Sequence, residues 1–212
     1  MINFRVQMEK VKFVVGITGG SGVGKTTLIK SLYDEFAGRV TTFSLDNYYR
    51  PKHEQAIDEN GVINFDLPSA LNQEDLRKDV ENLVNGDAIK QKVYGFNNPS
   101  NEENFQVIEP NELLLIEGLF VMHYEFLRPL LDYKVYLKVD EHLQLERRLK
   151  RDVEERNYSK DDVLYQWHNH VIPSYANYVK PYRGEADLII TNNESFDDNI
   201  HTLMEVIHQK LD

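Results

Sequence analysis

Eight residues near the start of the chain have the spacing of a phosphate-binding loop. Residues 19–26 match the pattern G-x-x-x-x-G-K-[ST], and they directly follow an apolar run at residues 13–18. Glycines at this spacing let successive backbone N–H groups turn toward a polyphosphate, while Lys25 supplies a cation and Thr26 a hydroxyl for Mg²⁺. The segment predicts a nucleoside triphosphate site, for which we expect contacts from Gly19, Gly20, Ser21, Gly22, Val23, Gly24, Lys25, Thr26 and Thr27.

Two carboxylates come directly after strand-like runs. Residues 40–45 lead into Asp46, and residues 113–116 lead into Glu117. Because parallel sheets form their sites at the carboxyl ends of the strands, we expect both side chains beside the phosphate loop. Each can serve Mg²⁺ or an acceptor hydroxyl, and for either one alone a helix N-cap or a solvated turn is the alternative. Together they favour a catalytic interpretation, in which Thr26, Asp46 and Glu117 form the metal-binding set.

A helical stretch at residues 141–156 carries a cluster of arginines. Arg148 and Arg151 share one helix face, and Arg147 is also a neighbour of Arg151. Planar guanidinium groups suit the charge on the oxygens of a phosphoryl group in transfer. The interspersed acidic residues leave a solvated, salt-bridged helix as the alternative. Its place after the strand-like run at residues 133–139 favours a lid over a nucleotide.

The composition limits the class of protein. A chain of 212 residues is long enough for one sizeable core, so we expect a single domain over residues 1–212. The formal net charge of −11 provides no general positive field for nucleic acid or anionic lipid. The chain has no cysteine, and no apolar run approaches the roughly 20 residues that span a bilayer. We therefore expect a cytoplasmic protein with a small-molecule partner, and neither a nucleic acid nor a membrane.

Strand-like runs alternate with amphipathic helical patterns along the chain. This alternation predicts an α/β fold of the P-loop NTPase type, in which helices flank a mostly parallel sheet in three layers. Between about residues 46 and 112 the alternation gives way to turn-rich sequence, and we expect this insert to recognise the acceptor. A helical lid is expected over about residues 142–180. The predicted strands are 13–18, 40–45, 113–116, 133–139 and 188–190, and the predicted helices are 26–36, 72–84, 141–156 and 197–211.

Other motifs give weaker signals. Residues 58–61 have the D-x-x-G spacing of a GTPase, but they lie in a polar stretch and the guanine-reading Asn-Lys-x-Asp motif is absent. His168 and His170 lack a carboxylate partner on the same face, so they make a poor metal site and are interpreted as surface or lid residues. A non-catalytic ATP-binding regulator stays open as an alternative, although the presence of Asp46, Glu117 and the arginines argues against it.

Several motifs in the same order resemble the uridine-cytidine kinases, within the phosphoribulokinase and uridine kinase group of P-loop enzymes. The likeness runs from about residue 14 to residue 190. It depends on the segments at 18–27, 46–49, 64–68, 93–96, 116–118, 147–152, 155–156 and 186–190.

The resemblance implies transfer of a phosphoryl group from ATP or GTP, with Mg²⁺, to the 5′-hydroxyl of uridine or cytidine. Asp46 would face that hydroxyl, and Asp66 would bind the ribose 2′- and 3′-hydroxyls. A homo-oligomer, either a tetramer or a dimer, is also implied. The implied catalytic residues are Asp46, Lys25, Arg148 and Arg151, and the implied substrate contacts are Tyr49, Asp66, Tyr94, Phe96, Arg148 and Gln166.

The chain departs from the family pattern where the base is expected to bind. Gly95 stands where an acidic residue is usual, residues 97–101 lack the usual histidine and basic residue, and Asn157 and Tyr158 replace a glycine and a basic residue. Asparagine offers both a donor and an acceptor, so amide side chains can replace these hydrogen bonds. A related kinase that acts on another ribosyl or sugar hydroxyl is the alternative.

Overall fold

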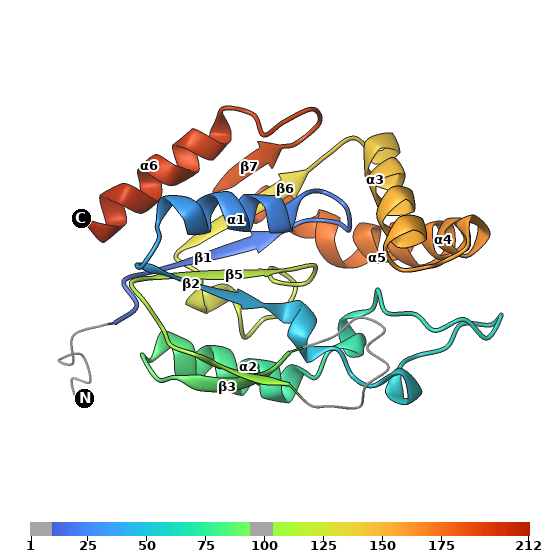
Figure 1. Ribbon diagram of the computed structural model, residues 1–212, viewed down its shortest axis with the longest axis horizontal. Helices are drawn as coiled ribbons and strands as arrows, with labels where there is room; N and C mark the ends of the chain where they lie inside the picture. Colours follow the sequence, from blue (N-terminus) through green and yellow to red (C-terminus); the bar gives the residue numbers. More distant parts are fainter. Residues whose placement is uncertain (1–9, 94–103) are drawn as a thin grey trace.

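A parallel five-stranded sheet forms the centre of the computed structural model, which describes residues 10–93 and 104–212 (Figure 1). The order of the strands is β2-β5-β1-β6-β7, and all neighbours run parallel. The predicted α/β fold with a mostly parallel sheet is therefore confirmed. The strands are β1 Phe13–Thr18, β2 Val40–Ser44, β5 Leu113–Gly118, β6 Tyr133–Lys138 and β7 Leu188–Thr191.

Helices cover both faces of the sheet, which explains why the central strands are apolar throughout. Every residue of β1 is buried, and so is all of β5 except Glu117. No helix in the described part of the chain has the length and apolar character needed to cross a bilayer. The α-helices are α1 Lys25–Glu35, α2 Gln73–Val84, α3 Glu141–Glu154, α4 Lys160–Gln166, α5 Ile172–Ser174 and α6 Asn199–Leu211.

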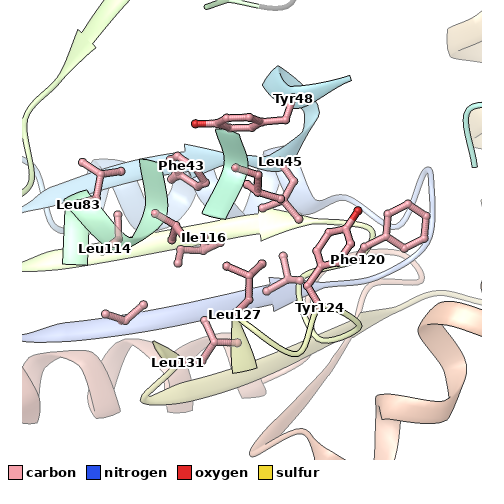
Figure 2. Close-up of a cluster of buried hydrophobic side chains, with 14 of the residues drawn as sticks. Phe43, Leu45, Tyr48, Leu83, Leu114, Ile116, Phe120, Tyr124, Leu127 and Leu131 are labelled. Carbon is pink, nitrogen blue, oxygen red and sulfur yellow. The ribbon is translucent and has the colours of Figure 1, made fainter. Parts of the chain in front are cut away.

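Two apolar clusters hold the layers together. On one face, Leu28 and Leu32 of α1 and Leu203 of α6 pack against β1 and its neighbours. On the other face, α2 and the segment that follows β5 pack against alternate residues of the same strands (Figure 2). Helices therefore lie on both sides of the sheet, which confirms the predicted three-layer arrangement (Figure 1).

The insert contains more regular structure than the sequence predicts. Helix α2 is present, and the side chain of its N-cap, Asn72, accepts a hydrogen bond from the N–H of Asp75. An antiparallel hairpin of β3 Ile89–Lys92 and β4 Phe105–Ile108 was not predicted. Both strands are short, with alternate residues of β3 and most residues of β4 exposed, so their apolar residues do not give a strong signal.

The ends of the strands differ slightly from the prediction, and the difference affects the site. Strand β2 stops at Ser44, and residues Leu45–Tyr48 form a 3₁₀ turn, while β5 continues through Glu117 to Gly118. A Cβ atom on Gly118 would lie 2.7 Å from Cβ of Leu45. The turn that carries Asp46 therefore packs directly on the end of β5 because residue 118 has no side chain.

We expect Gly118→Ala to destabilise the protein by about 1–3 kcal/mol, since the added methyl group overpacks this contact. The displaced turn should also lower turnover. Gly184→Ala is the matched control: among the described residues no heavy atom lies within 4 Å of its added Cβ. Urea unfolding and steady-state activity measure both variants, and equal losses of stability in the two would contradict the packing argument.

Candidate active site

A cavity of about 720 Å³ lies where the phosphate loop, the insert and the lid meet. Figure 1 shows these elements together beyond the carboxyl ends of the strands. Neighbouring strand ends are level, with Thr18 opposite Gly118 and Ser44 opposite Glu117. The predicted site residues that line the cavity are Ser21, Gly22, Gly24, Lys25, Thr26, Thr27, Asp46, Tyr49, Asp66, Glu117, Arg148, Arg151 and Gln166.

Not every predicted residue lies at the cavity wall. Gly19 and Gly20 lie in the phosphate loop without lining the cavity, and the side chain of Val23 belongs to the apolar core. Tyr94 and Phe96 are outside the residues that the structure describes. Their predicted contact with the acceptor stays a prediction.

The phosphate loop has the backbone that an anion site requires. Gly22 and Gly24 adopt φ values of 81° and 98°, which residues with a side chain rarely adopt. Gly24 is also the N-cap of α1, so the loop leads directly to the N–H groups at that helix end. Nζ of Lys25 donates to the carbonyl oxygens of Gly19 at 3.0 Å and Gly20 at 3.3 Å. The lysine is thus held over the loop.

Helix α3 fixes the outer side of the loop through Gln144, a residue that the sequence analysis missed. Its Nε2 donates to the carbonyl oxygen of Ser21 at 2.6 Å, and a Cβ on Gly20 would lie 2.3 Å from that nitrogen. Because the peptide is planar, a carbonyl that points toward α3 turns the next N–H to the opposite side. Gln144 precedes Arg148 by four positions, and this shared helix face is the signal that could have identified it.

Two carboxylates and a hydroxyl come together at the strand ends. Ser44 Oγ donates to Glu117 Oε1 and accepts from the N–H of Asp46 at 3.3 Å, so one serine links both carboxylates. Burial and the nearby charge of Asp46 raise the pKa of Glu117, while Lys25 acts in the opposite direction. A bound cation would relieve this repulsion.

This donor set fits Mg²⁺. Thr26, Asp46 and Glu117 offer only oxygen, and Mg²⁺ is commonly held by one or two carboxylates together with water and substrate phosphates. Within residues 10–93 and 104–212, no group of three or more His, Cys, Asp or Glu side chains gathers around a potential metal position. Two carboxylates and one hydroxyl leave coordination positions that water and substrate phosphates would fill.

Two arginines of α3 and Arg156, which follows the helix, surround a buried carboxylate. Asp152 Oδ1 accepts from Arg151 at 2.8 Å and Arg156 at 3.1 Å, and Oδ2 lies 3.3 Å from Nε of Arg148. The side chains of Asp152 and Arg148 are only 3% and 8% exposed, so the alternative of a solvated helix is wrong for this pair. Arg151 also reaches Ser21 Oγ at 3.3 Å.

Arg147 has a different environment from its neighbours. It donates to the carbonyl oxygens of Asn192 at 2.9 Å and Asn193 at 2.5 Å, which ties α3 to the loop after β7. Arg148 instead donates to Gln166 Oε1 of α4 at 3.3 Å. Two adjacent arginines therefore join α3 to different neighbours: Arg147 to the loop after β7, and Arg148 to α4.

The insert contributes Asp66 to the cavity wall. Burial raises the pKa of this carboxyl group, while Arg148 and His170 act to lower it. Tyr49 packs edge-on against Phe65, which also lines the cavity and was not predicted. His170 lies in the lid segment as expected, but it is buried and lines the cavity, so the surface interpretation is wrong for it.

One departure from the family pattern keeps the backbone shape. Asn157 has a φ of 58°, the only positive φ of a non-glycine residue in the described segments. Asparagine tolerates this region better than most residues, so it can replace the usual glycine. Tyr158, the next residue, lines the cavity.

The fold and the site together define a P-loop kinase: a parallel sheet carries a phosphate loop after β1, and an arginine-bearing helix packs on that loop. The sequence matches the model of the phosphoribulokinase / uridine kinase family over residues 14–197, and the chain belongs to this family. The predicted family resemblance and kinase class are confirmed.

Individual relatives agree with this assignment. The chain is 33% identical over 186 residues to a uridine kinase of Limosilactobacillus reuteri (strain DSM 20016), covering 87% of this chain and 85% of that one. It is 32% identical over 207 residues to a uridine kinase of Listeria innocua, covering 96% and 99%. A solved structure described as a possible uridine kinase from Bacillus stearothermophilus has a TM-score of 0.61 at 17% identity, covering 84% of this chain and 88% of that chain, which shows a shared fold.

We expect Glu117→Gln to raise the free energy of unfolding at neutral pH, because burial and Asp46 raise the pKa of Glu117 and oppose its charge. The advantage should disappear below about pH 4.3, where glutamate is neutral even in the unfolded chain. Urea unfolding at several pH values measures the difference.

Glu112→Gln is the control for this experiment. Hydrogen bonds from Arg39 and Lys12 lower the pKa of Glu112, so its replacement should reduce stability at neutral pH, and this loss should fade as the pH falls. The same sign for both variants would contradict the proposed electrostatics.

Proposed function

We propose that the protein transfers the γ-phosphoryl group of ATP to the 5′-hydroxyl of uridine or cytidine. The observation that carries the proposal is one cavity that joins the phosphate loop, Asp46 and Asp66. Relatives that share about a third of their residues over most of this chain are uridine kinases, which supports a nucleoside as the acceptor.

In this proposal the phosphate loop binds the donor, ATP or GTP. Backbone N–H groups of the loop and of the start of α1 face the phosphates, and Lys25 moves from the loop carbonyls to the β- and γ-oxygens. Mg²⁺, when bound through Thr26, Asp46 and Glu117, neutralises charge on these oxygens. Gln144 keeps the loop in the conformation that directs its N–H groups inward.

Asp46 orients the acceptor hydroxyl and takes its proton late in the transfer, since a loose transition state requires orientation more than early deprotonation. Asp66 accepts hydrogen bonds from the ribose hydroxyls, and Arg148 stabilises its charge. Tyr49 and Gln166 contact the nucleoside, and Tyr94 and Phe96 hold the pyrimidine.

Arg148 and Arg151 stabilise the charge on the transferring phosphoryl group. Asp152 keeps the guanidinium groups close together and oriented before any substrate binds. Such a preorganised group of donors requires little rearrangement during the reaction. A homo-oligomer, a tetramer or a dimer, and a cytoplasmic location both stay predictions.

Asp46→Asn should leave the dissociation constant for ATP nearly unchanged, because the phosphate loop is intact. It should lower kcat by about 10²–10⁴-fold, the usual contribution of a general base. Asp34→Asn, on an exposed position of α1, is the control for a lost surface charge. Unchanged turnover in Asp46→Asn would remove this residue from the mechanism.

We expect uridine or cytidine to stimulate the release of ADP from ATP in a coupled assay. Slow release without stimulation would indicate an ATPase, and no release would indicate a binding module. A panel of nucleosides and sugar phosphates extends the test, and stimulation by a sugar phosphate alone would support the related kinase alternative.

A further inference from the structure

Two residues to which the proposed function gives no role lie in contact in the structure. Asp58 lies in the insert, in the segment with the D-x-x-G spacing, and His170 lies in the π-helical turn Trp167–Val171 of the lid. Nε2 of His170 is 2.7 Å from Oδ2 of Asp58. The two side chains are 2% and 17% exposed, so solvent competes little for this contact.

The Asp58 carboxylate uses both of its oxygens. Oδ1 accepts from the N–H groups of Asn60 at 2.9 Å and Val62 at 2.8 Å, which closes the turn. Oδ2 accepts from the hydroxyl of Tyr165 at 2.8 Å and meets His170. Asn60 Nδ2 donates to the same tyrosine hydroxyl at 2.7 Å. One carboxylate therefore belongs both to the turn and to the lid. We call Asp58, Asn60, Tyr165 and His170 the lid–insert contact.

The charge of Asp58 is stable in this position. Burial acts to raise its pKa, but hydrogen bonds from the N–H of Val62, from Tyr165 and from His170 lower the pKa to about 2. The carboxylate is consequently ionised at neutral pH. A charged acceptor makes the stronger kind of hydrogen bond with the two lid side chains.

The turn that carries Asp58 continues directly into the wall of the cavity. Ile57 and Ile63 form an antiparallel bridge, and the N–H of Asn64 donates to the carbonyl of Ala56 at 2.8 Å. These bonds make residues 56–64 a short hairpin. Its last residues lead to the cavity-lining side chains Ile63, Phe65 and Asp66.

On the lid, His170 lies four positions after Gln166, and both line the cavity. Gln166 accepts from Arg148 of α3, whereas His170 meets the insert. The lid segment is thus held between α3 and the insert. None of the four side chains of the lid–insert contact hydrogen-bonds to the phosphate loop in the described structure, so the contact concerns the acceptor half of the cavity.

We propose that His170 is a positioning residue, which acts through Asp58 to join the lid to the insert and so sets Asp66 and Gln166 at the spacing that the acceptor requires. The proposal rests on the proposed function in that the acceptor is a nucleoside bound at Asp66. The residues that bind ATP lie outside the contact, so its loss affects the acceptor more than the donor.

Steady-state kinetics with ATP and uridine tests the proposal. Asp58→Asn keeps an oxygen for the turn N–H groups but removes the charged acceptor that the lid side chains share. His170→Leu removes the other partner. We expect each variant to raise KM for uridine about tenfold, the loss typical of a hydrogen bond with a charged group, with little change in KM for ATP.

Further variants separate positioning from general damage. His170→Gln keeps a side-chain N–H and should restore much of the uridine KM. The double variant Asp58→Asn/His170→Leu should be no worse than either single one, because both remove the same contact. Glu59→Gln and His168→Leu change exposed neighbours in the same turn and the same lid segment, and they should behave like the parent chain.

Any one of three kinetic results would overturn the proposal: equal increases in KM for uridine and ATP, additive effects in the double variant, or no rescue by His170→Gln. Hydrogen exchange of the parent chain and of Asp58→Asn provides a test that needs no acceptor: exchange should increase in residues 56–64 and also in residues 160–171. An increase confined to residues 56–64 would overturn the proposal. If uridine does not stimulate the parent chain but Asp58→Asn increases hydrogen exchange in both segments, the proposed acceptor is refuted and the lid–insert contact stands.

Discussion

The level carboxyl ends of β1, β2 and β5 are the constraint on which the rest of the site depends. Parallel pairing places Ser44 beside Glu117 and Thr18 beside Gly118. A glycine at 118 then lets the Asp46 turn pack on β5. Two carboxylates are held together at the phosphate loop in consequence, with a raised pKa for Glu117 that reflects burial and repulsion. This repulsion lies where the proposed function places a cation and the phosphates of the donor.

The opposite charge comes from α3 and from Arg156 just beyond it, and the buried carboxylate of Asp152 organises it. The chain as a whole carries a net charge of −11, so an anionic substrate depends on a local cluster of cations. Asp152 holds Arg148, Arg151 and Arg156 together, although three guanidinium groups would otherwise repel one another. Gln144 and Arg151 join this cluster to the phosphate loop. The donor half is therefore largely formed before substrate binds.

The proposed acceptor half is built differently, from segments that are distant in sequence. Asp66 comes from the insert, Gln166 and His170 come from the lid, and Arg148 comes from α3. The contact between Asp58 and His170 gives these segments a fixed relation without involving the phosphate loop.

The sequence by itself determined the phosphate loop, the parallel α/β fold and the positions of Asp46, Glu117 and the arginine helix. These features depend on local spacing, on short continuous apolar runs for the strands and on apolar residues with a period of 3.6 for the helices, which are visible along the chain. Asp66, Tyr94 and Gln166 were identified only through family resemblance, since no local pattern marks them.

Only the tertiary structure decided which polar residues meet. It showed that Gln144 holds the phosphate loop, that Arg147 is turned toward the loop after β7, and that His170 is buried against Asp58. It also revealed the hairpin of β3 and β4. The physical reason is that hydrogen bonds between residues 45 to 123 positions apart leave no periodicity in the sequence, because they depend on how separate elements pack rather than on local spacing.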